Sequence, residues 1–119
     1  MKNLISWVEI PSIDFKRAVS FYSKVLGTEL QVFECETEKM ACFPTGEGAI
    51  FEAEGYKPST DGVIVSLNTG NDLDGAIQRV QQNGGTIVIP KTKIEAEGRG
   101  YFSIFIDPEG NKLGLYGDN

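Results

Sequence analysis

The chain has 119 residues, a hydrophobic content of 40% and a formal net charge of −6, which are the proportions of one globular domain. Acidic residues outnumber basic ones by 17 to 11, and the resulting negative charge would repel a phosphate backbone, so we expect no nucleic acid partner. No apolar run approaches the roughly 20 residues of a membrane span and no signal peptide opens the chain, so we expect no membrane partner and a cytoplasmic location.

The first predicted element is a strand at residues 5–10. Trp7 and Glu9 alternate with Val8 and Ile10, which is the period of a half-buried strand. The pattern therefore predicts that Val8 and Ile10 pack into a core, while Trp7 and Glu9 lie on the opposite face.

A helix is predicted next. Pro11 has no N–H to donate to a sheet, so it ends the strand. Asp14 is a typical N-cap, and apolar residues then recur at helical spacing over residues 15–26. Gly27 predicts the C-terminal stop.

Three further strands complete the first half and give the order βαβββ. They are predicted at residues 29–35, 39–43 and 48–53. Cys35 and Cys42 flank the first turn between them without the C-x-x-C spacing of a redox pair, so we interpret both as half-buried thiols. Residues 54–61 lack periodicity and are predicted to link the two halves.

The second half repeats this order of elements. A strand at residues 63–68 precedes a helix that Asp72 would cap and that Gly84 and Gly85 would stop. A strand at residues 86–90 and a polar stretch at residues 91–100 follow. Each half has a sheet face that it cannot bury alone, so the repeat predicts two modules that share one core.

A hairpin closes the chain. Its strands are predicted at residues 101–106 and 112–116, around the turn Asp-Pro-Glu-Gly-Asn at residues 107–111. The proline has its φ already set and the glycine can adopt a positive φ, which are typical properties of a tight turn. The pattern places Leu113 and Leu115 under the helix, and Gly114 and Tyr116 on the other face.

Two motifs carry a resemblance to a known family. They are the turn at residues 107–111 and the helix pattern D-x-x-R-A-x-x-F-Y, formed by Asp14, Arg17, Ala18, Phe21 and Tyr22. With the repeat, they make the chain resemble the vicinal oxygen chelate superfamily, which includes glyoxalase I, bleomycin-resistance proteins and extradiol dioxygenases. The resemblance implies an α+β fold in which two βαβββ modules form an open, curved, eight-stranded half-barrel with the helices outside. It implies one glyoxalase-like domain over residues 1–119, with modules at about 1–56 and 57–119.

The resemblance also implies where metalloenzymes of this family hold their metal ligands. The matching positions here are Trp7, Gly62 or Ile64, Phe51 or Glu52, and Gly114. At most one carboxylate stands among them, whereas zinc, nickel and iron sites need three or four donor side chains. The chain also contains no histidine. We therefore expect no metal ligands and no cofactor.

The concave face of the half-barrel is the expected ligand site. Strand parity and the hairpin pairing give the following ligand-binding candidates: Trp7, Glu9, Phe51, Glu52, Ser66, Arg99, Phe102 and Tyr116. Each has a plainer interpretation: Trp7 as core or subunit contact, Glu9 as a rim carboxylate and Arg99 as a solvated loop residue. The sequence leaves open whether Phe51 or Glu52 faces the pocket.

These features lead to the hypothesis of a metal-independent protein of the glyoxalase and bleomycin-resistance type that binds a small organic ligand as a homodimer. An alternative is a glyoxalase-like lyase or isomerase that uses Glu9 and Glu52, or a metal completed by a partner chain, although no catalytic residue can be assigned. A third hypothesis is a module that acts only through protein contacts. The pairing of modules within one chain or between two chains stays open.

Overall fold

The computed structural model describes residues 4–119, so the predicted domain start at residue 1 lies outside the described residues. Module one contains β1 (Val8–Pro11), α1 (Phe15–Leu26), β2 (Gln31–Glu34), β3 (Glu38–Cys42) and β4 (Gly48–Ala53). Module two contains β5 (Ser66–Asn68), α2 (Leu73–Gln82), β6 (Thr86–Lys93), β7 (Tyr101–Ile106) and β8 (Lys112–Gly117). Both modules have the predicted order βαβββ.

Each module forms its own four-stranded sheet. The strand orders are β1-β4-β3-β2 and β5-β8-β7-β6. The first strand of each module is parallel to the last, and the other pairs are antiparallel. The predicted α+β fold, an open half-barrel of two βαβββ modules, is confirmed.

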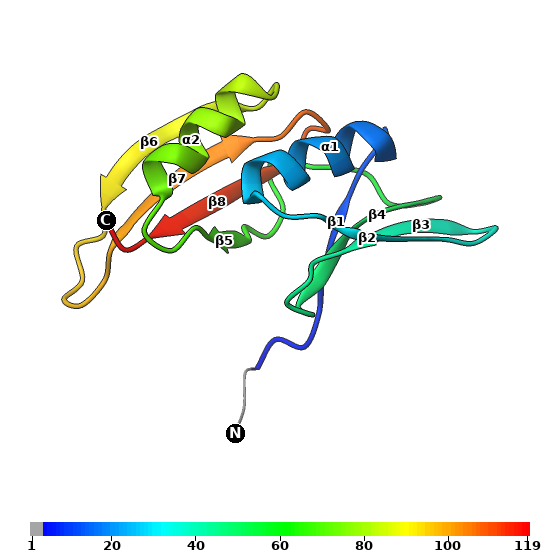
Figure 1. The fold of residues 1–119 in the computed structure, drawn as a ribbon, viewed down its shortest axis with the longest axis horizontal. Coiled ribbons are helices and arrows are strands. Elements are labelled where there is room, and N and C mark those ends of the chain that lie inside the picture. The colour runs from blue at the N-terminus through cyan, green and yellow to red at the C-terminus, as the bar shows by residue number, and fades with distance from the viewer. Residues whose placement is uncertain (1–3) are drawn as a thin grey trace.

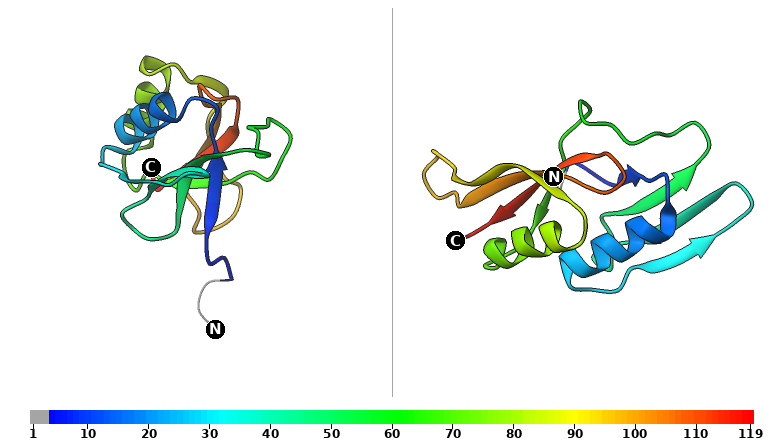
Figure 2. Two further views of the ribbon diagram at one scale, coloured as in Figure 1. Left: turned by 90° about the vertical axis from the view of Figure 1, so that its right-hand side faces the viewer. Right: turned by 90° about the horizontal axis from the view of Figure 1, so that it is seen from above.

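Both helices lie on the same side of the two sheets, next to each other (Figures 1 and 2). Among residues 4–119, no helix covers the other side of either sheet, and we call these two surfaces the open faces. Glu9 and Phe51 lie on the open face of module one, and Ser66 and Tyr116 lie on that of module two, as the strand register requires. The open faces of one chain are therefore turned in the same direction.

One hydrophobic core joins the helices to the helix side of both sheets. Ile10 and Ile50 of module one belong to it, as do Phe105 and Leu115 of module two. The ring of Phe21 on α1 lies 6.0 Å from the ring of Phe105, so the core is continuous between the modules. The predicted parity of the first strand and of the closing hairpin is confirmed.

The first strand of each module is shorter than predicted. β1 begins at Val8 and β5 begins at Ser66, where their parallel partners begin to pair with them. The N–H of Lys112, two residues before the position where β8 first pairs with β5, donates to the carbonyl of Ser59 at 3.1 Å. The Val65 carbonyl still accepts the Gly114 N–H at 2.8 Å, but the regular pairing starts only at Ser66, and Val63 is 90% exposed.

Three local expectations need correction. Cys35, which we interpret from the sequence as half-buried, is exposed, whereas Cys42 is partly buried. Asp14 caps α1 by accepting the N–H of Arg17, but Asp72 makes no side-chain cap on α2 and instead pairs with Arg79 at 3.1 Å. β6 continues past Pro90 to Lys93, with two shifts of register against β7. Proline is tolerated there because β6 is an edge strand.

Candidate ligand-binding site

Three of the predicted ligand-binding residues lie in module one on or next to its open face. Glu9 is exposed and lies opposite Ala49 in the ladder between β1 and β4. Trp7 stands two residues earlier and is 43% exposed. Phe51 is buried, because the ring of Tyr56 packs against it at a centroid distance of 5.2 Å. Module one thus offers an aromatic surface with one carboxylate.

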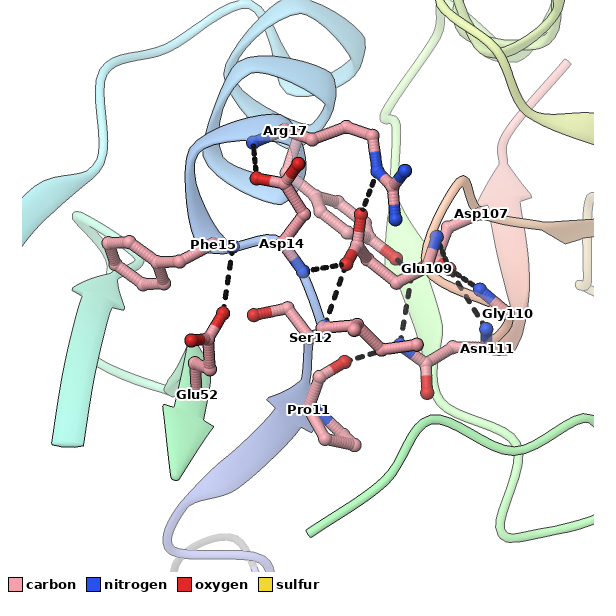
Figure 3. A network of polar contacts seen from close by, with 12 residues as sticks. Pro11, Ser12, Asp14, Phe15, Arg17, Glu52, Asp107, Glu109, Gly110 and Asn111 are labelled. Atoms are coloured by element: carbon pink, nitrogen blue, oxygen red, sulfur yellow. Dashed lines mark hydrogen bonds and ion pairs between the residues drawn. The ribbon is translucent and has the colours of Figure 1, made fainter. Parts of the chain in front are cut away.

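The structure separates Phe51 from Glu52. Phe51 lies on the open face, whereas Glu52 points to the helix side, where its Oε1 accepts the N–H of Phe15 at 2.9 Å. The Glu52 carboxylate therefore provides a hydrogen-bond acceptor for an otherwise unpaired N–H group at the start of α1, and it is turned away from the open face (Figure 3).

Module two contributes three residues to its own open face. Ser66 lies opposite Gly114, and Phe102 lies opposite Tyr116. The Tyr116 hydroxyl accepts the N–H of Gly100 at 3.3 Å, so the phenol is held by the loop before β7. Arg99 precedes Gly100 in that loop and is exposed.

One chain does not gather all these residues into one cavity. A cavity of about 780 Å³ is lined by Ser66, and another of about 710 Å³ is lined by Glu52. In the described part of the chain, neither is lined by the residues Trp7, Glu9, Phe51, Arg99, Phe102 or Tyr116. The predicted site is thus two half-sites, one on each open face.

The residues at the family's metal positions do not fit a metal ion. Phe51 is packed under Tyr56, and Glu52 is engaged by the N-terminus of α1. A Cβ at Gly114 would collide with the Ser66 hydroxyl, so no donor side chain fits there without displacing Ser66. Within residues 4–119, no three side chains of His, Cys, Asp and Glu lie close enough together to hold a metal.

The most extensive polar network is one that the sequence reasoning missed (Figure 3). The turn at residues 107–111 closes the predicted hairpin, but it also contacts the start of α1 in the other module. Glu109 Oε1 accepts the N–H groups of Ile13 and Asp14 at 2.7 and 2.6 Å, and its Oε2 pairs with Arg17 at 2.5 Å. We call this turn and its contacts the inter-module clamp.

Three carboxylates thus meet at one helix end. Glu109, Glu52 and Asp14 accept backbone N–H groups at the start of α1. The first N–H groups of a helix have no partner within it, and they carry the positive end of the helix dipole. Negative charge drawn from both modules therefore stabilises α1, which contacts both sheets through the shared core.

The clamp changes the acidity of its own members. Burial of the Glu109 carboxyl would raise its pKa, but hydrogen bonds from Arg17, Asp14 and Ile13 outweigh burial and lower the pKa below its ordinary value. The Glu109 hydrogen bond in turn raises the pKa of Arg17. Charged Glu109 is therefore the form that the folded chain favours.

Asp107 and Asn111 complete the clamp. Asp107 Oδ1 accepts three N–H groups of its own turn at 2.9 Å, and its Oδ2 accepts the Tyr22 hydroxyl at 2.6 Å. The Asn111 amide donates to the Pro11 carbonyl at 2.7 Å. The sequence contained the residues of this network in the helix motif and the turn motif that carry the resemblance. The contact between the two motifs spans most of the chain, however, and their spacing in the sequence does not predict it.

A family model described as the Glyoxalase/Bleomycin resistance protein/Dioxygenase superfamily matches residues 4–115. The chain belongs to this superfamily. Among proteins similar to this superfamily member is a "Glyoxylase-like domain-containing protein" of Didymella fabae, which is 36% identical over 89 residues, 68% of each chain.

Solved structures of the superfamily share the fold of this member. A glyoxalase/bleomycin resistance protein from Albidiferax ferrireducens has a TM-score of 0.75 at 18% identity, over 98% of this chain and 100% of the other. A genomically encoded fosfomycin resistance protein, FosX, from Listeria monocytogenes has a TM-score of 0.72 at 16% identity, over 100% and 96%. At these identities the likeness concerns the fold. No helix between residues 4 and 119 has the length and apolarity needed to cross a membrane.

Proposed function

We propose that this superfamily member is a metal-independent protein that binds a small organic ligand on its open sheet faces as a cytoplasmic homodimer. The observation that carries the proposal is the chemistry of these faces, on which aromatic and apolar side chains lie beside a few polar groups. Within residues 4–119, no group of donor side chains could hold a metal ion. Pockets for small molecules are largely apolar with a few convergent polar groups. The unpaired thiols of Cys35 and Cys42 suit a reducing compartment.

The exposure of apolar side chains on the open faces supports the homodimer. Trp7, Phe33 and Ile89, which lie on or next to them, are 43%, 55% and 39% exposed. Apolar surface of this kind marks interaction sites. A ligand pocket encloses most of its ligand. The two open faces of one chain are turned in the same direction, so they cannot enclose a ligand between them (Figure 1). A second copy would supply the missing wall.

Polar groups on the two half-sites would orient the ligand. Glu9 is an exposed carboxylate beside Trp7, and Ser66 and Tyr116 offer hydroxyl groups on the other face. An aromatic molecule with a hydrogen-bond donor fits this set, because it can stack on Trp7 and donate to Glu9.

A glyoxalase-like lyase or isomerase is the second candidate. It is favoured by the exposed Glu9 carboxylate on the open face, which a substrate could reach for proton transfer. Glu52 would not share this role, because its carboxylate accepts the Phe15 N–H on the helix side. Turnover that is lost in Glu9→Gln while the melting temperature is unchanged would favour the enzyme.

The homodimer is tested by sedimentation velocity on the full chain. We expect a dimer whose dissociation constant rises at least tenfold in Phe33→Glu, because a charge is costly in an apolar interface. Gln78→Glu, on an exposed position of α2, is the matched control and should change nothing. A monomer at all concentrations would contradict the homodimer.

Ligand binding is tested by a thermal-shift screen of small aromatic metabolites, with and without a metal chelator. A ligand that binds only the folded state raises the melting temperature with its concentration. We expect the chelator to leave the shifts unchanged and Trp7→Ala to abolish them. Shifts that require added zinc, nickel or iron would overturn metal independence.

A further inference from the structure

A groove of about 780 Å³ lies at the junction of the two modules. We call it the junction groove. Its walls come from the segment before β1, the C-terminal end of α1, the turn between β3 and β4, and β5. The volume is within the range of about 300–1,000 Å³ that is typical of small-molecule sites.

Of the residues assigned to the half-sites of the open faces, only Ser66 also lines the junction groove. Val8 and Leu67 line it and also pack against the helix-side core. The neighbouring residue Glu9 points to the opposite face of β1. The groove meets an open face only at Ser66 and Asn68, which line its edge.

The walls of the groove are mainly aliphatic. Leu4, Ile5, Leu26, Phe43, Val65 and Leu67 all line it. Leu4 and Ile5 are 83% and 70% exposed, although they belong to this lining. An elongated aliphatic ligand would cover these side chains and remove their surface from water, which is favourable in proportion to the area buried.

One charged group stands in this apolar lining. Among the described residues that line the groove, the carboxylate of Glu47 is the only ionisable side chain. The Thr45 hydroxyl donates to Glu47 Oε1, and the Glu47 carbonyl accepts the Val8 N–H at 3.0 Å. The turn is thereby attached to β1, and the carboxylate is held at the groove.

We propose that the junction groove binds an elongated aliphatic compound that carries a single positively charged amino group. The hydrocarbon chain lies along Leu26, Phe43 and Leu67, and the ammonium group pairs with Glu47. A cation is selected because the Glu47 carboxylate and the net charge of −6 repel an anion of the same length. The proposal is independent of ligand binding on the open faces.

Isothermal titration of the full chain with n-butyl-, n-hexyl- and n-octylammonium chloride tests the proposal. We expect the affinity to rise about threefold to fourfold for each added methylene, because each one buries further apolar surface. Octanoate should bind at least tenfold more weakly than octylammonium. Equal affinity for octanoate, or no dependence on chain length, would overturn the proposal.

Variants separate this groove from other sites. Glu47→Gln should weaken octylammonium binding about tenfold, as expected for loss of a charge-assisted hydrogen bond. Glu95→Gln, an exposed carboxylate outside the groove, is the matched control and should leave binding unchanged. Trp7→Ala should also leave it unchanged, whereas it should abolish binding to the open faces. Loss of octylammonium binding in Trp7→Ala, with retention in Glu47→Gln, would place the ligand on an open face and refute the groove site.

A second copy of the chain is the competing occupant of the groove. Sedimentation velocity with saturating octylammonium distinguishes the two. We expect the dimer fraction to be unchanged, because the ligand and the partner use different surfaces. Dissociation of the dimer by octylammonium would mean that the partner chain fills the groove, and it would overturn the proposal.

Discussion

The hydroxyl of Tyr22 on α1 donates a 2.6 Å hydrogen bond to Oδ2 of Asp107, which opens the turn between β7 and β8. Both residues are buried, and 85 positions of sequence separate them. The bond therefore joins module one to module two inside the shared core. It also explains why the helix motif and the turn motif occur together, since each supplies half of the inter-module clamp.

Replacing Tyr22 by phenylalanine should destabilise the fold by about 1–3 kcal/mol, because Asp107 Oδ2 loses its phenolic donor while the ring still packs. Tyr56→Phe is the control, since Tyr56 is 61% exposed. Urea unfolding measures both free energies. A Tyr22→Phe protein as stable as the control would show that the bond contributes nothing.

Tyr22 should also make the fold sensitive to alkali. Burial raises the pKa of Tyr22 well above its ordinary value, and neighbouring Asp107 adds to the effect. The unfolded chain releases this proton near pH 10 while the folded chain retains it. Stability should thus be complete below about pH 10 and fall above it. Urea titrations from pH 9 to 11 should show this fall in the natural chain and a smaller one in Tyr22→Phe.

Truncation of Glu109 to alanine should cost about 2–4 kcal/mol, because it leaves the N–H groups of Ile13 and Asp14 without an acceptor. Little of this cost is expected from the ion pair itself, since the Arg17 side chain is 49% exposed and screened by solvent. Glu95→Ala is the surface control. Equal urea midpoints for the two variants would contradict the role of Glu109 as a helix cap.

Glu109 should couple stability to acid as well. Its pKa is lowered in the folded chain, so its contribution is present above the ordinary carboxyl pKa of about 4.3 and is lost as the pH falls below it. Glu109→Gln retains an oxygen for the two N–H groups but no longer titrates. The variant should therefore lose less stability than the natural chain between pH 4.5 and 2.5. Parallel acid profiles would refute the linkage.

Gly48→Ala should destabilise module one by about 1–3 kcal/mol, a typical cost of overpacking. A Cβ at Gly48 would collide with the backbone carbonyl of Val8, which cannot move without disturbing the parallel pair of β1 and β4. Gly62→Ala is the matched control, because the nearest atom to its added Cβ is 3.9 Å away. Thermal unfolding that ranks Gly62→Ala below Gly48→Ala would contradict this reasoning.

Cys35 should be the more reactive thiol. A hydrogen bond with Thr37 lowers the pKa of Cys35, which is exposed, whereas Cys42 is partly buried. Iodoacetamide at neutral pH should label Cys35 first, and Thr37→Val should slow the labelling by severalfold. Peptide mapping after short exposure measures both rates. Faster labelling of Cys42 would contradict the prediction.

The fold class was readable from the sequence because strand and helix periods are local. Alternation placed Val8 and Ile10 in the core, and it placed Leu113 and Leu115 of the closing hairpin under the helices, as the structure has them. The Asp14 cap also involves only neighbouring residues, so its role could be predicted. Asp72 occupies the equivalent position in the second module, but its side chain pairs with Arg79 and does not cap α2. The repeat alone therefore does not predict the role of each matching residue.

The two βαβββ modules and the apolar side of most strands could be predicted, because these features depend on residues a few positions apart. Long-range contacts set the rest: Glu52 accepts an N–H of α1 while Phe51 lies on the open face, and Glu109 reaches the same helix from the other module. The predicted ligand-binding residues likewise lie on two open faces and do not surround one cavity. These outcomes depend on contacts between residues far apart in the chain, 37 positions for Phe15 and Glu52 and 96 for Ile13 and Glu109, and no local period carries that information.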